Sequence, residues 1–522
     1  MRRRDFLGAT LFGSAAAALP LTAGHALAEI PLAELLDGMQ AGRWTARQLV
    51  DQYLARIDAI DRNGPCLNAV IEINPEATAI ADELDGELRA GRRRGPLHGI
   101  PVLIKDNIDT GDRMQTTAGS LALAGSTAPH DAFIVARLRA AGAVLLGKTN
   151  LSEWANFRSA SSSSGWSARG GQTRSPYVLD RNPSGSSSGS ATAAAASLAA
   201  LAVGTETDGS IISPSSAGGL VGIKPTVGLW SRAGIIPISH SQDTAGPMCR
   251  TVADAAMLLG ALTGVDEHDP ATLASRGHAL SDYRPYLRAD GLRGARLGVM
   301  RRHMNISAKV ERVYDEALRA LAAAGAVLID PVDLPDPTAM GEAEWDLLAY
   351  EFKAGIAAYL RSRSATTAHR TLADLIAFNV ANAEREMPWF GQDIFEYAQK
   401  SESLASPKYQ RLHARCRRLA RERGLDPSFA RYRLDALVAV AGGPAWPIDL
   451  VNGDRYTGGG GSYAAVAGYP AITVPAGDLH GLPIGLLFMG RPWSEGRLIE
   501  LAFAFEQATR ARRPPGFRRS VA

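Results

Sequence analysis

The feature that most constrains this chain is a run of small side chains from Ser184 to Val203, built almost entirely of Ser, Gly, Ala and Leu. Its Ala-rich part, Ser190 to Val203, predicts a helix about 21 Å long. The following segment, Gly204 to Gly209, spans roughly 20 Å when nearly extended. Ser210 can therefore return beside Ser186 without strain, and the small side chains allow the helix to pack closely against its neighbours.

The hydrophobic pattern of the remaining chain predicts alternating strands and helices. Apolar runs bounded by Gly or Pro predict buried strands at residues 70–73, 101–104, 143–146, 295–300, 436–440, 471–474 and 484–488. The capping box Thr45-x-x-Gln48 begins one predicted helix, and helical periodicity predicts others over 310–323 and 495–506. This alternation is typical of an α/β fold whose sheet is covered by helices on both faces.

The chain is expected to form a single domain after its first residues. Nothing in its middle resembles a linker, so the domain is predicted to cover residues 29–522. Residues 340–435 are largely helical in pattern, charged and without a recognisable motif, and are interpreted as a helical insert. The run Gly458–Gly461 is predicted to be a flexible turn. Whether that turn borders a ligand stays open at this point.

The first 28 residues have the pattern of an export signal. Arg3-Arg4-Asp5-Phe6-Leu7 is a twin-arginine motif, and a weakly apolar stretch follows it. Ala26-Leu27-Ala28 offers a small-residue cleavage site before Glu29. We therefore expect export in the folded state by the twin-arginine machinery, which would place the protein in the periplasm or outside the cell. No segment reaches the roughly 18–20 apolar residues needed to span a bilayer, so stable membrane insertion is not expected.

Charge and cysteine content exclude several classes of partner. The formal net charge is +3, and removal of residues 1–28 leaves about +1, with no basic stripe for nucleic acid. Cys66, Cys249 and Cys416 are too far apart in sequence to indicate a disulfide framework. No histidine pair has metal-ligand spacing. The sequence predicts neither a metal nor an organic cofactor.

Three short segments carry candidate chemistry. Ser186 and Ser210 lie on glycine-rich backbone with consecutive peptide N–H groups, and Lys105 ends the apolar run 101–104. Hydroxyls beside peptide N–H groups are the parts of an acyl-transfer site. The segment Gly185–Gly189 also fits the G-x-S-x-G nucleophile elbow, with Ser187 at its centre. That alternative is weak because turn residues, and not a strand, precede the segment.

These segments resemble the amidase signature family. The resemblance rests on Gly99–Asn107, Gly185–Ser190, Gly204–Pro214, Gly222–Thr226 and Asp243–Met248. The similarity is strong over about residues 97–256, which we take as the signature core, and fainter over 460–506. Further motifs at 151–156, 165–172 and 205–210 are most similar to bacterial peptide amidases, which hydrolyse C-terminal peptide amides. The resemblance implies a large mixed, twisted β-sheet covered by helices.

The resemblance also implies a Ser-cisSer-Lys triad. Ser210 matches the nucleophile, Ser186 the bridging serine after a cis peptide bond with Gly185, and Lys105 the base, while Ser187 matches a supporting serine. The backbone N–H groups of Thr207, Asp208, Gly209 and Ser210 match the oxyanion hole. The chain departs from many family members, which have Gly in place of Asp208 and Ser188 and Arg in place of Ile212.

The chemistry requires a neutral Lys105. Its pKa must fall by roughly three units from about 10.4, and burial after an apolar strand supplies the desolvation. The expected activity is hydrolysis of a carboxamide to carboxylate and ammonia through an acyl-enzyme, with the C-terminal amide of a peptide as the leading substrate. An amidase for small aryl or alkyl amides is the alternative within enzymes. A non-catalytic periplasmic binding protein on the same scaffold is the alternative outside them.

Overall fold

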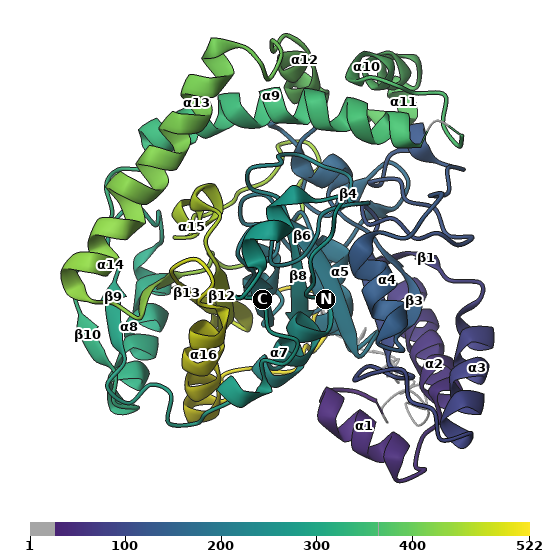
Figure 1. Ribbon diagram of the computed structural model, residues 1–522, viewed down its shortest axis with the longest axis horizontal. Helices are drawn as coiled ribbons and strands as arrows, with labels where there is room; N and C mark the ends of the chain where they lie inside the picture. The colour runs from purple at the N-terminus through teal and green to yellow at the C-terminus, as the bar shows by residue number, and fades with distance from the viewer. Residues whose placement is uncertain (1–26, 364, 522) are drawn as a thin grey trace, which may run out of the picture.

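The protein is built around one eleven-stranded mixed β-sheet. A computed structural model describes residues 27–363 and 365–521. The strand order is β1-β3-β2-β6-β8-β7-β12-β13-β11-β9-β10 (Figure 1). In chain order the strands are β1 Val70–Ile73, β2 Pro101–Lys105, β3 Val144–Thr149, β6 Leu201–Glu206, β7 Val221–Lys224, β8 Thr244–Cys249, β9 Arg296–Val299, β10 Val327–Ile329, β11 Ala436–Val440, β12 Ala471–Leu479 and β13 Leu482–Met489. β4 Trp166–Ser167 and β5 Gly171–Gln172 form a separate hairpin.

Parallel and antiparallel pairs are combined in this sheet. β2 runs parallel to both β3 and β6, and β9 runs parallel to both β10 and β11. The central pairs β6 with β8, β7 with β8, and β12 with β13 are antiparallel. The predicted α/β fold with a mixed sheet is confirmed.

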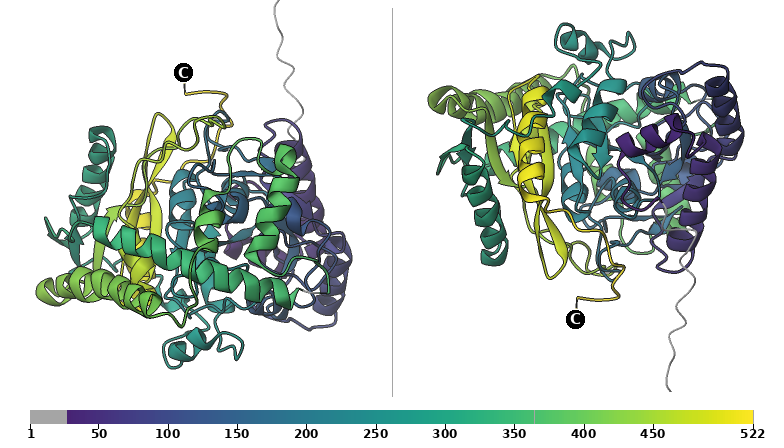
Figure 2. Two further views of the ribbon diagram at one scale, coloured as in Figure 1. Left: turned by 90° about the horizontal axis from the view of Figure 1, so that it is seen from above. Right: turned by 90° about the horizontal axis from the view of Figure 1, so that it is seen from below.

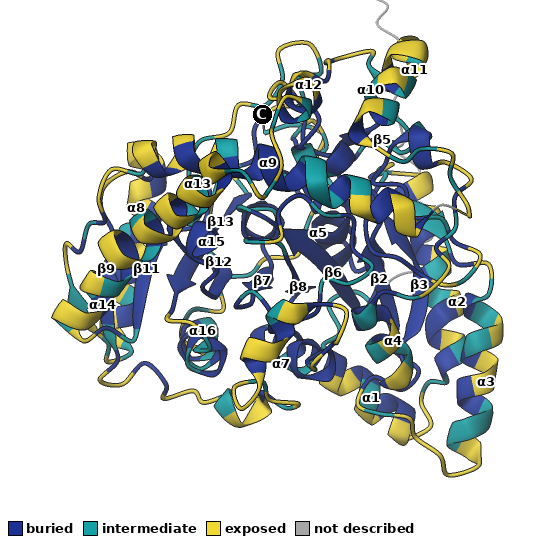
Figure 3. Ribbon diagram, turned by 45° about the horizontal axis from the view of Figure 1, so that its top comes forward, coloured by how far each residue is buried: buried dark blue, intermediate teal, exposed yellow. Residues whose placement is uncertain are grey.

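Helices cover both faces of the sheet (Figure 2). They are α1 Leu32–Gln40, α2 Ala46–Arg56, α3 Ala77–Arg89, α4 Phe133–Ala140, α5 Ser188–Ala195, α6 Ile212–Ala217, α7 Val252–Ala261, α8 Ala308–Ala323, α9 Thr338–Ser362, α10 Leu372–Ala381, α11 Ala383–Glu386, α12 Asp393–Gln399, α13 Pro407–Arg417, α14 Asp426–Tyr432, α15 Ser462–Ala467 and α16 Glu495–Thr509. The predicted capping box is present at α2, where Thr45 Oγ1 accepts from Gln48 N at 3.1 Å. Figure 3 shows the strands and α5 in the buried interior, with exposed residues on the outer helices.

The predicted helix over Ser190–Val203 is wrong in its length. The helix α5 ends at Ala195, and Leu201–Glu206 forms strand β6 between β2 and β8. Local propensity favours a helix through this Ala-rich run, but the backbone of residues 201–206 gains ladder hydrogen bonds at the centre of the sheet. The shorter helix and the strand still bring the segment around Ser210 back to the start of α5, since Ser187 N donates to Ser210 O at 3.2 Å.

Small side chains allow α5 to lie close to the neighbouring backbone. All of its residues are buried. A Cβ at Gly189 would lie 2.4 Å from both Ala69 O and Asn150 O. The first turn of α5 therefore lies directly against the backbone of Asn150, after β3, and of Ala69, before β1.

The helices α9 to α14 follow β10 and lie along one side of the molecule. In Figure 1, α9, α10, α11 and α12 lie across the top, and α13 and α14 descend along the left edge. A second hydrophobic cluster joins α9 and α12 to the segment 151–157, where Trp154 packs edge-on to Phe395 at 5.7 Å and Phe157 to Phe352 at 5.0 Å between ring centroids. These contacts hold the helices against loops that follow β3.

The described chain begins within the predicted cleavage motif. The twin-arginine motif lies outside the described residues. Leu27 is only 1% exposed, and the Glu29 carboxylate forms an ion pair with Arg512 at 2.8 Å. No helix in residues 27–363 or 365–521 is long and apolar enough to cross a membrane.

The close packing of α5 predicts a specific loss of stability. Gly189→Ala should lower the free energy of unfolding by about 1–3 kcal/mol because its methyl group would overlap two backbone carbonyl oxygens. Chemical denaturation monitored by circular dichroism measures the change. Gly341→Ala is the matched control: this exposed glycine lies inside α9 with no atom within 4 Å of an added Cβ, so the change should stabilise by about 0.5–1 kcal/mol. Equal stability of the two variants would contradict the packing argument.

Candidate active site

Lys105 lies at the centre of a buried hydroxyl cluster. It is the last residue of β2 and is 0% exposed. Its Nζ lies 2.8 Å from Ser186 Oγ, 3.1 Å from Ser187 Oγ and 2.9 Å from Thr205 Oγ1. The structure therefore brings Lys105, Ser186 and Ser187 together as the sequence predicted.

The environment of Lys105 favours its neutral form. Burial lowers the pKa of the amine to about 7, while the carboxylates of Glu206 and Asp243 act in the opposite direction. Neither carboxylate forms an ion pair with Lys105 within the part of the chain that the structure describes. The neighbouring Asp106 is also fully buried, but its carboxylate pairs with Arg169 at 3.3 Å and not with Lys105.

Ser186 and Ser187 are positioned by the entry into α5. The peptide bond between Gly185 and Ser186 is cis, as the family resemblance implied. Ser187 Oγ donates to Thr205 O at 2.9 Å and accepts from Thr205 N at 3.1 Å. Ser187 thus ties the start of α5 to the end of β6, and this places Ser186 Oγ beside Lys105 Nζ.

Ser210 lies in the turn that joins β6 to α6. It is partly exposed and lines a cleft, whereas Ser186 is fully buried. Among the described residues, no hydrogen bond joins the hydroxyls of Ser210 and Ser186. The turn and the start of α5 are joined by the hydrogen bond from Ser187 N to Ser210 O, and no hydrogen bond within the described part of the chain holds the Ser210 hydroxyl in place.

Backbone N–H groups in this turn are open to the cleft. Gly209 has φ of +82°, a conformation that favours glycine, although an added Cβ would meet no atom within 4 Å. Within residues 27–363 and 365–521, the N–H groups of Asp208, Gly209 and Ser210 donate to no protein acceptor. Thr207, Asp208, Gly209 and Ser210 all line the cleft. Unpaired donors at a cleft wall can bind a developing negative charge.

Glu206 organises this turn, and sequence reasoning missed it. Its Oε2 accepts from Ile211 N at 2.7 Å and from Ile212 N at 2.9 Å. A carboxylate that binds the first N–H groups of a helix is a capping interaction, so a Glu shortly before α6 was the available signal. Thr205 was also missed, although its hydroxyl bonds both Lys105 Nζ and Asn107 Nδ2.

The cleft at Ser210 has a volume of about 540 Å³. Its wall combines the turn after β6, the loop 155–164, residues of α9 and α12, and the loop between β11 and α15. Away from the turn, this wall includes the side chains of Phe157, Ile238, Trp345, Leu348, Ile394, Trp446, Asp454 and Tyr456. Tyr456 and Ser462 flank the Gly458–Gly461 turn and line the cleft, whereas none of the four glycines does so in the described structure.

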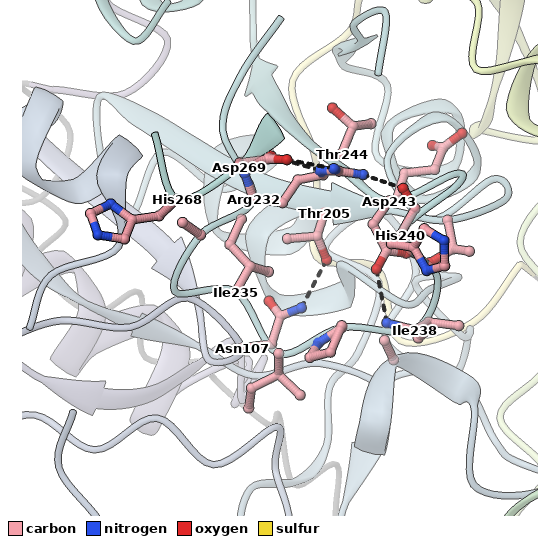
Figure 4. A pocket seen from close by; sticks show the side chains of 16 residues that line it. Asn107, Thr205, Arg232, Ile235, Ile238, His240, Asp243, Thr244, His268 and Asp269 are labelled. Atoms are coloured by element: carbon pink, nitrogen blue, oxygen red, sulfur yellow. Dashed lines mark hydrogen bonds and ion pairs between the residues drawn. The ribbon is translucent and has the colours of Figure 1, made fainter. Parts of the chain in front are cut away.

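A second, smaller cavity of about 190 Å³ lies beside the lysine cluster (Figure 4). Asn107 and Thr205 line it, and it shares the wall residues Ala155, Thr207 and Ile238 with the cleft. Asp243 links two segments of this shared wall, because its carboxylate accepts hydrogen bonds from Thr207 Oγ1 at 2.6 Å and from Ile238 N at 2.9 Å. Burial raises the pKa of Asp243 to about 6. Thr207 therefore lines both spaces, whereas Ser210 lines only the larger cleft.

The candidate metal ligands do not converge. Within the described chain, no group of three or more His, Cys, Asp or Glu side chains is arranged to hold a metal ion. His98 is buried and bonds Arg94 N and Leu84 O, which is a structural arrangement. His240 is half exposed and contacts Tyr409 and Glu351.

Comparison with known proteins gives the class of this α/β protein, which is an amidase. The chain belongs to the Amidase family, whose family model matches residues 48–499. A probable amidase of Arabidopsis thaliana is 43% identical over 513 residues, which cover 96% of this chain and 94% of that protein.

Two solved peptide amidase structures are also similar. The native peptide amidase of Stenotrophomonas maltophilia is 53% identical, with a TM-score of 0.89, and the match covers 94% of this chain and 99% of that one. The peptide amidase PAM in complex with the competitive inhibitor chymostatin is 54% identical, with a TM-score of 0.90 and the same coverage. The predicted resemblance to bacterial peptide amidases is confirmed.

Proposed function

We propose that this amidase hydrolyses the C-terminal amide of peptides through an acyl-enzyme formed on Ser210. The observation that carries the proposal is the fully buried Lys105 amine, 2.8 Å from Ser186 Oγ and with a pKa lowered to about 7. A neutral amine is a general base, and Ser186 is the hydroxyl through which it acts.

In the first step Ser210 Oγ attacks the amide carbonyl carbon. Its proton passes to Ser186 Oγ, whose own proton passes to Lys105 Nζ. The Ser210 hydroxyl must turn towards Ser186 for this transfer, and such contacts commonly tighten only with substrate bound. The carbonyl oxygen becomes negatively charged and accepts hydrogen bonds from N–H groups among Thr207, Asp208, Gly209 and Ser210.

In the second step the C–N bond breaks and the relay reverses. Lys105 returns a proton through Ser186 to the leaving nitrogen, which departs as ammonia, and the acyl group remains on Ser210. Water then attacks this ester and passes a proton through Ser186 to Lys105. That proton returns to Ser210 Oγ as the C–O bond breaks, and the acid product leaves and ionises to the carboxylate. Ser187 takes the positioning role, because its hydroxyl holds Lys105 Nζ and the backbone of Thr205 together.

Two observations favour a peptide over a small amide. The cleft volume of about 540 Å³ lies in the range of sites for ligands larger than a simple amide. Two similar solved structures are peptide amidases, and one of them is a complex with the competitive inhibitor chymostatin. A small aryl or alkyl amide would react at the same serine but fill only part of this cleft.

Substitution of the relay residues tests the reaction. Ser210→Ala should abolish ammonia release from an acetylated dipeptide amide, and Lys105→Met should lower kcat/KM by about 10²–10⁴-fold while the protein stays folded. Ser190→Ala is the matched control, since this buried serine bonds Thr149 and Val203 O away from the cleft, and it should retain activity.

Benzamide measured in parallel separates the two substrate classes. The proposal is contradicted if the wild-type enzyme releases ammonia from neither amide, or if Lys105→Met hydrolyses the peptide amide at the wild-type rate.

The pKa of Lys105 predicts the pH dependence. The amine must be neutral to act, so kcat/KM should fall about tenfold per pH unit below pH 7 and level off above it. The Glu206 carboxylate raises the pKa of Lys105. Glu206→Gln should therefore move the acidic limb to lower pH, whatever it does to the maximal rate. A limb that stays in place or moves to higher pH would show that another group titrates.

We also propose that residues 1–28 direct twin-arginine export to the periplasm or beyond. The support is the motif Arg3-Arg4-Asp5-Phe6-Leu7 and the small residues before Glu29. In fractionated cells, replacement of Arg3 and Arg4 by Lys should retain the protein in the cytoplasm. Sequencing the N-terminus of the exported chain distinguishes a start at Glu29 from one that keeps the buried Leu27.

A further inference from the structure

We propose that Trp345 and Tyr456 form an aromatic subsite in the cleft, which binds an apolar or aromatic side chain of the peptide amide. This inference rests on the proposed function and adds the class of peptide that the site selects. Both side chains line the same cleft as Ser210, although they come from segments far apart in the sequence.

Trp345 is a partly exposed aromatic side chain at the wall of the cleft. It lies on α9 and is 40% exposed, while Leu348, almost one turn later on the same helix, is buried. The indole is held from two sides, with ring centroids 6.1 Å from Phe157 and 6.4 Å from Tyr397. A tryptophan that is fixed in position and left open at a cleft wall is a typical ligand contact.

Tyr456 presents a second aromatic surface to the same cleft. It is 49% exposed and packs edge-on against Trp446 at 5.8 Å. Trp446 Nε1 donates to Asp454 Oδ1 at 3.1 Å, and both Asp454 oxygens also accept from Ser164 N. The loop that carries Tyr456 is therefore braced against the loop 155–164, so the ring has a defined position without substrate.

Apolar side chains contribute to the cleft lining alongside its serines and aspartates. Phe157, Leu348 and Ile394 are buried and line the cleft together with Ile238. Such a surface gains free energy when an apolar side chain displaces water from it. Other exposed aromatic side chains, such as Trp389 at 45%, are not in the lining of this cleft.

The charge of the cleft favours neutral or basic side chains over acidic ones. The charged residues in its lining are Asp208 and Asp454, and no Lys, Arg or His of the described chain lines it. A carboxylate in the cleft would therefore lose water and meet like charge. The occupant that fits is a peptide amide with an aromatic or aliphatic side chain.

The test uses acetylated tripeptide amides in which one phenylalanine occupies each position in turn, with triglycine amide as reference. The wild-type enzyme should prefer phenylalanine in at least one position by about tenfold in kcat/KM. Trp345→Ala and Tyr456→Ala should each remove most of that preference, measured as the ratio of kcat/KM for the phenylalanine-containing amide to kcat/KM for triglycine amide, with the loss mainly in KM. Glutamate in the same position should lower kcat/KM below the glycine value.

Trp389→Ala is the matched control, because it removes an exposed tryptophan of similar accessibility outside the cleft. It should leave the preference intact, and thermal unfolding of each variant verifies its fold. The inference is overturned if the wild type shows no side-chain preference, or if Trp345→Ala and Tyr456→Ala both keep it. Failure of the wild type to hydrolyse any peptide amide would instead refute the proposed function, so the two failures are distinguishable.

Discussion

The structure depends on holding an uncharged amine in its interior. A buried ammonium is costly unless a partner compensates it, and the partners of Lys105 are hydroxyl groups and not carboxylates. Those hydroxyls come from the start of α5 and from the end of β6. The lysine is therefore surrounded correctly only when β2 and β6 are neighbours in the sheet and α5 returns onto them. The hydroxyl groups that satisfy the buried amine also position it beside Ser186, close to the turn that lines the cleft.

Close backbone approach is what makes that arrangement possible. Gly204 on β6 faces Ser187, and a Cβ there would lie 2.8 Å from Ser187 Oγ and 2.5 Å from Met248 Sδ. Gly189, within α5 itself, likewise allows close approach, because a Cβ there would lie 2.4 Å from Asn150 O. Larger side chains at either position would push the helix away and open the hydroxyl cluster. The small residues of this region thus set distances in the active site as well as filling the core.

The molecule separates the parts that carry the reaction from the parts that shape the cleft. The sheet and α5 hold the lysine, the serines and the turn with open N–H groups. The walls beyond them come from α9, α12 and the loop before α15, which contribute Trp345, Ile394 and Tyr456. The helices α9 and α12 pack against the loops that follow β3 through a separate hydrophobic cluster, and the side chains that they contribute to the cleft are not among the hydroxyl partners of Lys105.

The sequence by itself determined the α/β class and most strand positions, because these signals are local runs. Its motifs also singled out Lys105, Ser186 and Ser210 as site residues, and the structure places Lys105 Nζ beside Ser186 Oγ. Sequence reasoning was wrong about the helix over Ser190–Val203, where ladder hydrogen bonds at the sheet centre outweigh the helical propensity of alanine. Only the tertiary structure decided that Glu206 binds the first N–H groups of α6, and that Trp345 and Tyr456 share one cleft. Contacts between distant segments leave no periodic pattern in a single sequence, since each partner is individually an ordinary residue in its own segment.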